Sequence, residues 1–150
     1  MAARKASEND PRLLLDHQLC FALYSASLAM TKIYKPLLEP LGLTYPQYLV
    51  LLVLWEQAPM NVSAIGDRLT LDSGTLTPLL KRLEALGYVT RMRDAADERR
   101  VFVQLTAEGR KLKTRAAEIP PCLLAASHCS ETELVSLTRE VRAFRDKLLG

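Results

Sequence analysis

A cysteine and two tyrosines lie in one stretch of sequence whose apolar residues recur with helical spacing. Tyr24 follows Cys20 by four residues, so in a helix both side chains lie on one face, one turn apart. Tyr34 follows Cys20 by fourteen residues, which returns it to within about 40° of the same direction but about 21 Å further along the axis. Tyr34 therefore cannot touch Cys20 of its own chain. It can approach Cys20 of a second chain if the two helices pack antiparallel.

This grouping of side chains suits redox chemistry. Phenolic hydroxyl groups that donate hydrogen bonds to the sulfur of Cys20 would favour its thiolate, and the thiolate is the form that attacks peroxides. The plainer interpretation is that Cys20, Tyr24 and Tyr34 are core or interface residues, because a buried cysteine is usually inert. The residues alone leave both interpretations open.

Two further cysteines, Cys122 and Cys129, bring the total to three. An odd number without a CxxC pair argues against a disulfide framework and against a zinc ribbon. No run of about 18 apolar residues could span a bilayer, and residues 1–11 are polar rather than signal-like. We therefore expect a cytoplasmic protein with reduced thiols and no membrane partner.

A metal site is one alternative use of these thiols. His17, Cys20, His128 and Cys129 offer ligand atoms, and His17 and Cys20 share a helical face at a spacing of three residues. However, no CxxC or HxxxH pair supports such a site, and both histidines have plainer surface roles. The sequence therefore predicts neither a metal nor a cofactor.

Length and composition describe a single globular domain, residues 1–150, that is mainly α-helical. Of its residues, 49% are hydrophobic and 25% charged, while only 6% are aromatic. The strands of a β-sandwich are usually richer in aromatic residues, so this composition favours helices. The net charge of +3 hides an uneven distribution, because residues 81–115 hold ten Lys and Arg against five Asp and Glu, a net charge of +5. A locally basic segment suits a polyanion-binding surface, although it can also be ordinary solvated surface.

Residues 62–86 predict a helix-turn-helix. A short helical segment over 62–69 is followed by a longer one over 73–86, with Asp72 placed to cap the second helix and Gly87 just past its end. In the second helix Leu76, Leu79, Leu80 and Leu83 recur as one inward face. Small, hydroxyl-bearing and basic residues then remain for contact with a DNA major groove: Ser73, Gly74, Thr75, Thr77, Pro78, Lys81 and Arg82. An ordinary surface helix is the alternative, but such helices more often carry mixed Glu and Lys pairs.

A β-hairpin is predicted directly after the helix-turn-helix. Residues 88–93 and 99–105 are rich in β-forming residues, and a polar stretch separates them. This hairpin would form a wing that carries Arg93 and, near its tip, Asp97 and Arg99. The carboxylate of Asp97 is near enough to hold the guanidinium of Arg99, which could then enter a narrow, electronegative minor groove. An exposed ion pair contributes only about 0 to 1 kcal/mol of stability, so DNA binding explains the pair better than folding does.

The outer parts of the chain are predicted to be helical. A first helix over 13–34 is followed by Pro36, Pro40 and Gly42, which end it, and a second apolar helix ends near Gln57. Thr44 and Gln47 form a capping box at the start of that second helix. After the predicted hairpin, a helix starting at Thr106 is interrupted by Pro120 and Pro121. Ser130 and Glu133 form a second capping box at the start of the last helix.

These elements divide the domain by function. Residues 44–110 would be the winged helix-turn-helix core, and residues 12–43 and 111–150 would be dimerisation helices. The outer helices carry more apolar surface than one small winged module needs. A homodimer also suits pseudo-palindromic double-stranded operator DNA, because two-fold operators require two-fold proteins.

Several segments resemble the organic hydroperoxide resistance regulators, a peroxide-sensing branch of the multiple-antibiotic-resistance regulator (MarR) family. The similar segments are residues 16–24, 30–38, 43–48 and 71–82. Asp97-Glu98-Arg99 followed by residues 105–109 is similar to the broader family's wing pattern. The Cys20 context together with Tyr24, Tyr34 and Tyr45 is specific to the peroxide sensors. The similarity is close over roughly residues 13–115, whereas the C-terminal third is generic.

The resemblance implies a dimeric winged-helix repressor, not an enzyme, that organic hydroperoxides release from the operator of an organic peroxide resistance gene. Cys20 would be the redox-sensing residue, in a pocket with Tyr24, Tyr34 and Tyr45 and near Phe21 and Met30. Some family members stop at a sulfenic acid or at a mixed disulfide with a small thiol, whereas in others a late cysteine resolves the oxidised sensor across the dimer. Cys129 best resembles that resolving position, and Cys122 is the alternative.

Two other functions remain as alternatives. A related repressor could be released by a reversibly bound phenolic ligand, with Cys20 as a bystander. A thiol peroxidase would share the first oxidation step, but it would leave the helix-turn-helix, the wing and the basic segment without a use.

Overall fold

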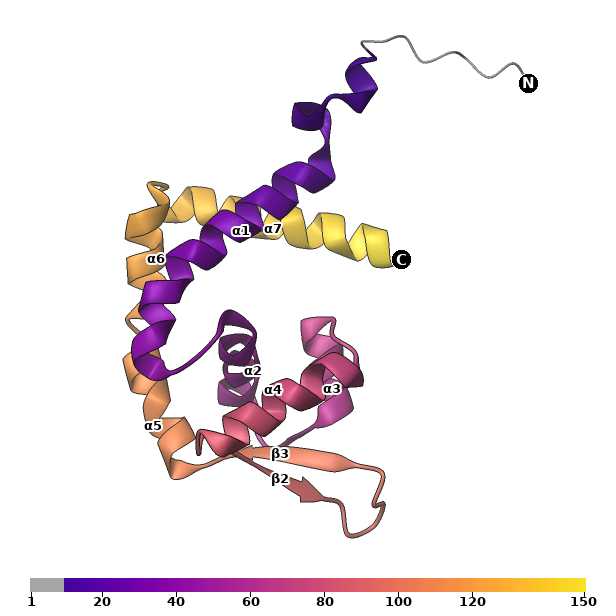
Figure 1. Ribbon diagram of the computed structural model, residues 1–150, viewed down its shortest axis with the longest axis vertical. Helices are drawn as coiled ribbons and strands as arrows, with labels where there is room; N and C mark the ends of the chain where they lie inside the picture. The colour runs from indigo at the N-terminus through magenta and orange to yellow at the C-terminus, as the bar shows by residue number, and fades with distance from the viewer. Residues whose placement is uncertain (1–9) are drawn as a thin grey trace, which may run out of the picture.

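The computed structural model describes residues 10–150, so most of the polar N-terminal arm, residues 1–9, lies outside the described residues. The elements follow one another as drawn in Figure 1: η1 (Pro11–Leu13), η2 (Leu15–His17), α1 (Leu19–Leu38), η3 (Glu39–Leu41), α2 (Tyr45–Glu56), β1 (Met60–Asn61), α3 (Val62–Leu69), α4 (Ser73–Ala85), β2 (Val89–Arg93), β3 (Val101–Leu105), α5 (Ala107–Ala116), α6 (Ile119–Ser127) and α7 (Glu131–Leu149). The chain is mainly helical, as predicted, with a small antiparallel sheet.

The prediction of a first helix over residues 13–34 is wrong at both ends. Its start is replaced by the short 3-10 helices η1 and η2, because Leu14 and Gln18 adopt extended backbone with ψ of 136° and 116°. At the other end α1 continues through Pro36 to Leu38. Pro36 lies in the last turn, where the missing N–H removes a single hydrogen bond. Gly42, with φ of 71°, then ends this part of the chain.

The two predicted capping boxes, at the starts of α2 and α7, are confirmed. Gln47 Oε1 accepts the backbone N–H of Thr44 at 3.0 Å at the start of α2. At the start of α7 the same reciprocal arrangement joins Ser130 and Glu133. Pro120 and Pro121, by contrast, do not interrupt a helix, because they lie in the first turn of α6, where a proline loses no helical hydrogen bond. The helix ends earlier, at Ala116 of α5, and a new helix begins at Ile119.

The wing is a three-stranded sheet in the order β1-β3-β2. The predicted hairpin pairs Val89 with Leu105 and Arg93 with Val101. Strand β1 was not predicted, since it is only two residues long and pairs Met60 with the distant Val103. The sheet therefore joins the segment before α3 to the wing.

The hydrophobic core lies beneath the helix-turn-helix. Leu76, Leu80 and Leu83 of α4 are buried, as predicted, and they belong to one buried cluster with Ile65 of α3 and Leu51 of α2. Helix α7, in contrast, has no buried residue. Figure 1 shows α1 and α7 at the end of the molecule opposite β2 and β3. The core therefore positions the recognition helix and wing, while the outer helices leave apolar surface uncovered.

Among the described residues, no helix is by itself long and apolar enough to cross a membrane. One bent pair of helical segments meets that criterion of length and composition when taken together: residues 19–41, which comprise α1 and η3, and α2. The two segments meet at an angle of 70°.

Candidate functional site

Cys20 is the second residue of α1, and its side chain is exposed. Tyr24, one turn further along, is 61% exposed, and Phe21 and Met30 are exposed as well. Cys20 and Tyr34 thus lie in the first and last thirds of one continuous helix. As expected from their spacing, the structure does not bring the thiol and Tyr34 together within one protomer.

Tyr34 belongs instead to a cluster of three tyrosines between α1 and α2. Its ring centroid lies 4.8 Å from that of Tyr45 and 5.9 Å from that of Tyr48. Tyr45 and Tyr48 lie 6.4 Å apart. The sequence analysis did not assign Tyr48 to the site, although its spacing of three residues from Tyr45 on one helix was a usable signal.

Burial raises the pKa values of these phenols. Burial, together with the neighbouring Tyr45 and Tyr48, raises the pKa of Tyr34 to about 12. Burial also raises the pKa of Tyr45 and that of Tyr48 above their ordinary value. Near neutral pH these hydroxyl groups are neutral, as ordinary phenols are, and can donate hydrogen bonds.

Tyr34 also lines an open groove of about 730 Å³ between α1, α6 and α7, which we call the α1/α6/α7 groove. All of the other lining residues come from α6 and α7: Pro120, Pro121, Leu123, Leu124, Glu131, Leu134, Val135, Thr138, Arg139 and Arg142. Phe21 and Met30 do not line it. The predicted pocket of Phe21, Met30 and Tyr34 is therefore not formed by one protomer alone.

The two late cysteines have different settings. Cys129 lies in the turn between α6 and α7, half-buried, with its Sγ 3.4 Å from the carbonyl oxygen of Ser127. Cys122 is exposed within α6 and lines a second hollow beside Arg115. Across residues 10–150 no group of three or more His, Cys, Asp and Glu side chains is arranged to hold a metal ion.

The recognition helix α4 begins as the sequence predicts. Asp72 Oδ1 accepts the backbone N–H of Thr75 at 2.7 Å, and the hydrogen bonds from Thr75 hold the pKa of the Asp72 carboxyl below its ordinary value. Thr77 is half-buried, whereas the other six residues predicted for the groove-facing side are exposed: Ser73, Gly74, Thr75, Pro78, Lys81 and Arg82. The structure therefore leaves this side of α4 free for contact.

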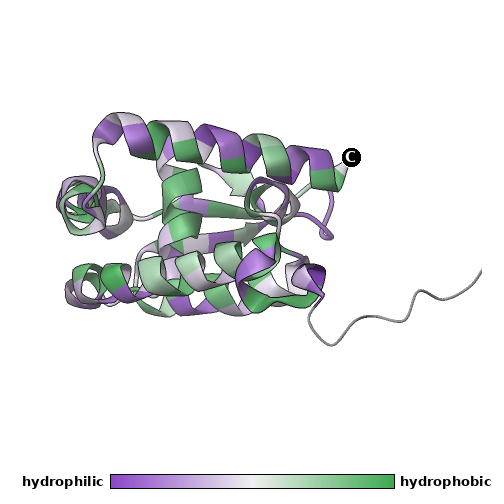
Figure 2. Ribbon diagram, turned by 90° about the horizontal axis from the view of Figure 1, so that it is seen from above, coloured by the Kyte–Doolittle hydropathy of each residue, from purple (hydrophilic) through white to green (hydrophobic). Residues whose placement is uncertain are grey.

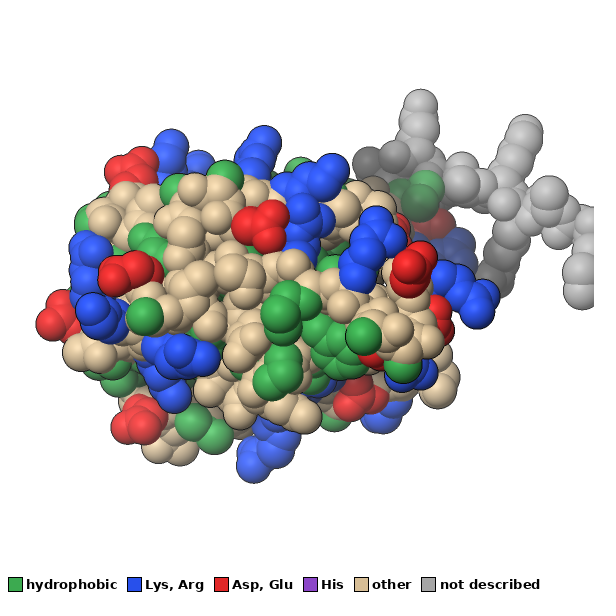
Figure 3. All heavy atoms as spheres, turned by 90° about the horizontal axis from the view of Figure 1, so that it is seen from below, with side chains coloured by type: hydrophobic (Ala, Val, Ile, Leu, Met, Phe, Trp, Pro, Cys, Tyr) green, Lys and Arg blue, Asp and Glu red, His purple; other side chains and the backbone are tan. Residues whose placement is uncertain are grey.

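The wing carries the predicted ion pair. Arg99 Nε lies 3.4 Å from Asp97 Oδ1, and the side chain of Arg99 is 93% exposed. Arg93 is exposed and reaches back to the carbonyl oxygen of Glu98 at 3.3 Å. Figure 3 looks onto this end of the molecule, where Lys and Arg side chains are spread across the face with acidic ones between them.

A hollow of about 370 Å³ lies between the recognition helix and the wing. Its lining combines hydroxyl groups with cations, the groups that bind phosphate oxygens: Asn61, Val62, Ser63, Ser73, Thr77, Leu80, Arg91, Arg99, Arg100 and Val101. The sequence analysis predicted Ser73, Thr77 and Arg99 of this set. It did not assign Arg91 or Arg100 to the DNA-facing surface.

Arg91 ties the wing to the recognition helix. Glu84, near the end of α4, accepts the backbone N–H of Arg91 at 3.0 Å and its guanidinium at 3.2 Å. These contacts hold the pKa of the Glu84 carboxyl below its ordinary value. The position of β2 relative to α4 is therefore fixed by side chains as well as by the core.

Comparison with known proteins decides the family. The SarA/Rot family of transcriptional regulators matches residues 32–116. The organic hydroperoxide resistance transcriptional regulator of Bacillus subtilis is 52% identical over 82% of this chain and 84% of its own length. The chain belongs to the MarR/SarA family of winged helix-turn-helix transcriptional regulators. It is a regulator and not an enzyme, which removes the thiol peroxidase alternative.

Solved structures confirm the fold of this MarR/SarA family member. Reduced AbfR of Staphylococcus epidermidis bound to DNA is 37% identical and has a TM-score of 0.75, covering 91% of this chain and 95% of AbfR. The disulfide form of AbfR is 38% identical with a TM-score of 0.61, covering 87% and 91%. The predicted winged helix-turn-helix is therefore confirmed, and this chain is more similar in shape to the reduced form.

Proposed function

We propose that this regulator is a homodimeric repressor that binds pseudo-palindromic operator DNA and is released when an organic hydroperoxide oxidises Cys20. Release would permit expression of an organic peroxide resistance gene. Residues 44–110 bind DNA, and residues 12–43 and 111–150 form the dimer. Binding to operator DNA places the protein in the cytoplasm with the chromosome.

The observation that carries this proposal is the position of Tyr34. Its hydroxyl belongs to a partly buried tyrosine cluster, yet its side chain also lines an open apolar groove. An apolar hydroperoxide fits such a surface, and the phenols can donate hydrogen bonds to a sulfur or to a peroxide oxygen. Antiparallel packing of two α1 helices supplies the sulfur from Cys20 of the second copy. Phe21 and Met30, exposed on α1, join the site in the same way.

The oxidation proceeds in two balanced steps. The Cys20 thiolate attacks the terminal oxygen of the hydroperoxide, the O–O bond breaks, and the alkoxide leaves and takes up a proton from water to become an alcohol, so that Cys20 becomes a sulfenic acid. A second thiol then attacks this sulfur, forming a disulfide and releasing water. The cysteine is oxidised by two electrons, and the peroxide is reduced.

Cys129 is our choice for the second thiol. It lies in a turn between two helices, where the backbone can move more easily than at Cys122 within α6. A disulfide requires Cα atoms about 4.4 to 6.8 Å apart, so forming it moves the outer helices. Since the outer helices set the separation of the two recognition helices, oxidation weakens simultaneous docking on both half-sites.

The DNA-binding end supplies the other half of the function. The exposed side of α4 enters the major groove, the hollow between α4 and the wing holds backbone phosphates, and Arg99 enters the minor groove. Arg93 contributes a further positive charge on the wing. Exposure, charge and the MarR/SarA fold support these roles.

The test uses fluorescence anisotropy with an operator selected from genomic fragments by the reduced protein. Cumene hydroperoxide should release the unmodified protein, and dithiothreitol should restore binding. Cys20→Ser should bind the operator and stay bound after peroxide. Release of Cys20→Ser by the peroxide would contradict the proposal. Nonreducing electrophoresis and peptide mass spectrometry then assign the partner thiol, with an intersubunit Cys20–Cys129 link expected.

A reversibly bound phenolic ligand remains a second candidate, favoured by the size and apolar lining of the α1/α6/α7 groove. In that case a phenolic compound would release Cys20→Ser as readily as the unmodified protein, and dithiothreitol would have no effect.

A further inference from the structure

Two side chains bond the end of α1 to the base of the wing and to α5. The hydroxyl group of Tyr88 donates to the carbonyl oxygen of Leu41 at 3.0 Å, across 47 residues of sequence. The guanidinium of Arg115 donates to the carbonyl oxygen of Pro40 at 3.1 Å, across 75 residues. Tyr88 directly precedes β2, Arg115 lies near the end of α5, and both carbonyl groups belong to η3. We call these two contacts the η3 clasp.

The clasp uses carbonyl groups that a helix end leaves free, because the last carbonyl oxygens of a helix have no partner within it. The N–H groups of Gly42 and Leu43 donate to the carbonyl oxygens of Glu39 and Leu38. The next two carbonyl oxygens, in η3, therefore depend on donors from elsewhere in the chain. The positive charge of Arg115 also suits the negative end of the helix dipole.

The residue that holds η3 from the wing belongs to one unit with the recognition helix. The backbone N–H of Tyr88 donates to the carbonyl oxygen of Leu83 in α4, and its carbonyl oxygen accepts the N–H of Thr106 before α5, both at 3.0 Å. Further along β2, Arg91 is bonded to Glu84 of α4. A displacement of the Tyr88 side chain therefore acts on α4, the wing and α5 together.

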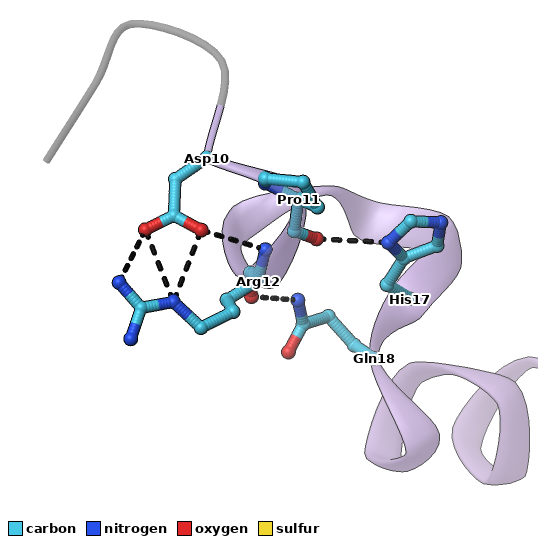
Figure 4. A network of polar contacts seen from close by, with 5 residues as sticks. All are labelled: Asp10, Pro11, Arg12, His17 and Gln18. Atoms are coloured by element: carbon cyan, nitrogen blue, oxygen red, sulfur yellow. Dashed lines mark hydrogen bonds and ion pairs between the residues drawn. The ribbon is translucent and has the colours of Figure 1, made fainter.

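Helix α1 is stiff enough to carry a displacement to the clasp. It runs unbroken for 20 residues into η3, and in Figure 1 it reaches the region where α5 meets α6. At its start Gln18 Nε2 donates to the carbonyl oxygen of Arg12, and His17 Nδ1 to that of Pro11, both at 2.8 Å, so the preceding turns are fixed to the helix (Figure 4). At about 1.5 Å per residue, Cys20 lies about 28 Å along the axis from the start of η3.

The other contacts of α1 hold its direction less firmly. Figure 2 shows α7 as a layer apart from α1, with α6 joining them at one side, and α7 has no buried residue. Tyr34 packs against Tyr45 of α2, but apolar packing is non-directional. Hydrogen bonds weaken steeply when their angle changes. The clasp is therefore the directional connection between α1 and the DNA-binding end.

We propose that the η3 clasp couples the state of Cys20 to DNA affinity, with Tyr88 and Arg115 as positioning residues that touch neither the thiol nor the DNA. When oxidation displaces α1, η3 moves with it, and the clasp turns α4 and the wing as one body. This inference rests on the proposed function for its trigger, the oxidation of Cys20. It adds the joint through which that trigger reaches the recognition helix.

A small rotation at the clasp is enough to undo DNA contacts. Helix α4 has 13 residues, and its groove-facing Ser73 and Gly74 lie at the end away from Tyr88. A rotation of about 10° about the clasp moves that far end, about 20 Å away, by about 3 Å. Hydrogen bonds span only about 2.7 to 3.2 Å between donor and acceptor, so such a shift breaks contacts to the bases.

Operator affinity before and after oxidation tests the clasp. Tyr88→Phe removes only the hydroxyl group, so the reduced variant should bind the selected operator as the unmodified protein does. The fold-change in affinity caused by complete oxidation with cumene hydroperoxide should shrink about 3- to 30-fold, the range found for removing one coupling contact. Anisotropy measures both affinities, and mass spectrometry verifies that the two proteins reach the same oxidised form. An unchanged ratio of reduced to oxidised affinity would overturn the proposal.

Variants of Arg115 test the second contact on an exposed residue, where a loss of folding is not expected. Arg115→Met removes the donors and should shrink the same ratio, whereas Arg115→Lys keeps a donor and the charge and should retain more of it. Lys113→Met is the matched control, because Lys113 is exposed on the same helix and within residues 10–150 forms no ion pair. Equal effects of Arg115→Met and Lys113→Met would contradict a specific clasp.

Hydrogen exchange gives a readout that needs no peroxide. Because coupling between two sites is reciprocal, operator binding should slow exchange of the Gly42 and Leu43 amides in the unmodified protein and slow it less in Tyr88→Phe. The two proposals can then fail separately. Peroxide release of Cys20→Ser would remove the trigger but not this difference. Equal slowing in both proteins would remove the clasp and leave the peroxide response of Cys20 intact.

Discussion

At the residue scale, the sequence predicted one ion pair that the structure confirms and missed another. Asp97 and Arg99 lie two residues apart, so their pairing follows from local geometry and is confirmed. Arg91 and Glu84 also form a pair, but they meet only because β2 folds back along α4. Tyr48 was missed for a similar reason, since its contact with Tyr34 depends on how α1 and α2 cross.

The half-buried Tyr34 should give a distinctive alkaline titration. Its pKa is raised from 10.0 to about 12 in the folded chain, so the folded state keeps a proton that the unfolded state loses. The stability linked to this group is complete below pH 10 and is lost as the pH rises toward 12. In the near-ultraviolet absorbance of phenolate, Tyr34→Phe should remove the part of the curve at highest pH. Tyr24→Phe, at the exposed tyrosine of the same helix, should leave that part in place.

The guanidinium of Arg99 should contribute to DNA affinity in a salt-dependent way. Arg99→Gln should weaken operator binding about tenfold and reduce the slope of log affinity against log salt by about one. Arg145→Gln provides the control, because Arg145 is also exposed and paired with an acid, but on α7. Equal losses for the two variants, measured by anisotropy at several salt concentrations, would argue against a wing contact.

At the element scale, local sequence signals predict where helices start better than where they end. Thr44, Asp72 and Ser130 act through hydrogen bonds to residues three positions away, so the sequence reveals them. The prediction that Pro36 and Pro120 mark helix breaks is wrong. A proline is disfavoured in the interior of a helix but tolerated near its ends, and both prolines lie in a terminal turn. Strand β1 exists only through pairing with β3, which no local pattern encodes.

Alanine substitutions at two glycines should have different effects, one on folding stability and the other on DNA affinity. A Cβ at Gly109 would lie 2.1 Å from the carbonyl oxygen of Tyr88, so Gly109→Ala should destabilise the fold by about 1 to 3 kcal/mol. A Cβ at Gly74 would meet only Asp72 Oδ1, at 3.4 Å. Gly74→Ala should therefore keep the melting temperature while weakening operator binding, because the added methyl group stands on the side of α4 that approaches DNA. Thermal unfolding and anisotropy on both variants check this separation, and a large drop in melting temperature for Gly74→Ala would contradict it.

At the scale of the whole molecule, the sequence predicted a DNA-binding core between two sets of outer helices. It did not predict the groove between α1, α6 and α7 or the two short 3-10 helices before α1. Both depend on where helices end and how they cross, which the apolar periodicity of a single segment cannot specify. The segment of η1 and η2 resembles the first turn of a helix in sequence because its leucines continue the apolar pattern of α1.

The proposed two-fold dimer would fix the spacing of the operator half-sites at about one helical turn. Inserting about five base pairs between the half-sites rotates one of them to the opposite side of the duplex. Affinity should then fall to that of a single half-site, as measured by anisotropy. Replacing the same number of central bases without changing the length provides the control. Unchanged affinity for the lengthened operator would argue against simultaneous docking by a rigid dimer.

Trp55 is the one tryptophan in the chain, and it lies where α2 meets the start of α5. Its indole Nε1 donates to the carbonyl oxygen of Gly109 at 2.9 Å, which links α2 to α5. Its ring meets Tyr48 edge-on, with centroids 6.4 Å apart. Intrinsic tryptophan fluorescence of the protein therefore comes from the contact between α2 and α5, so a shift in emission reports movement there without an added dye.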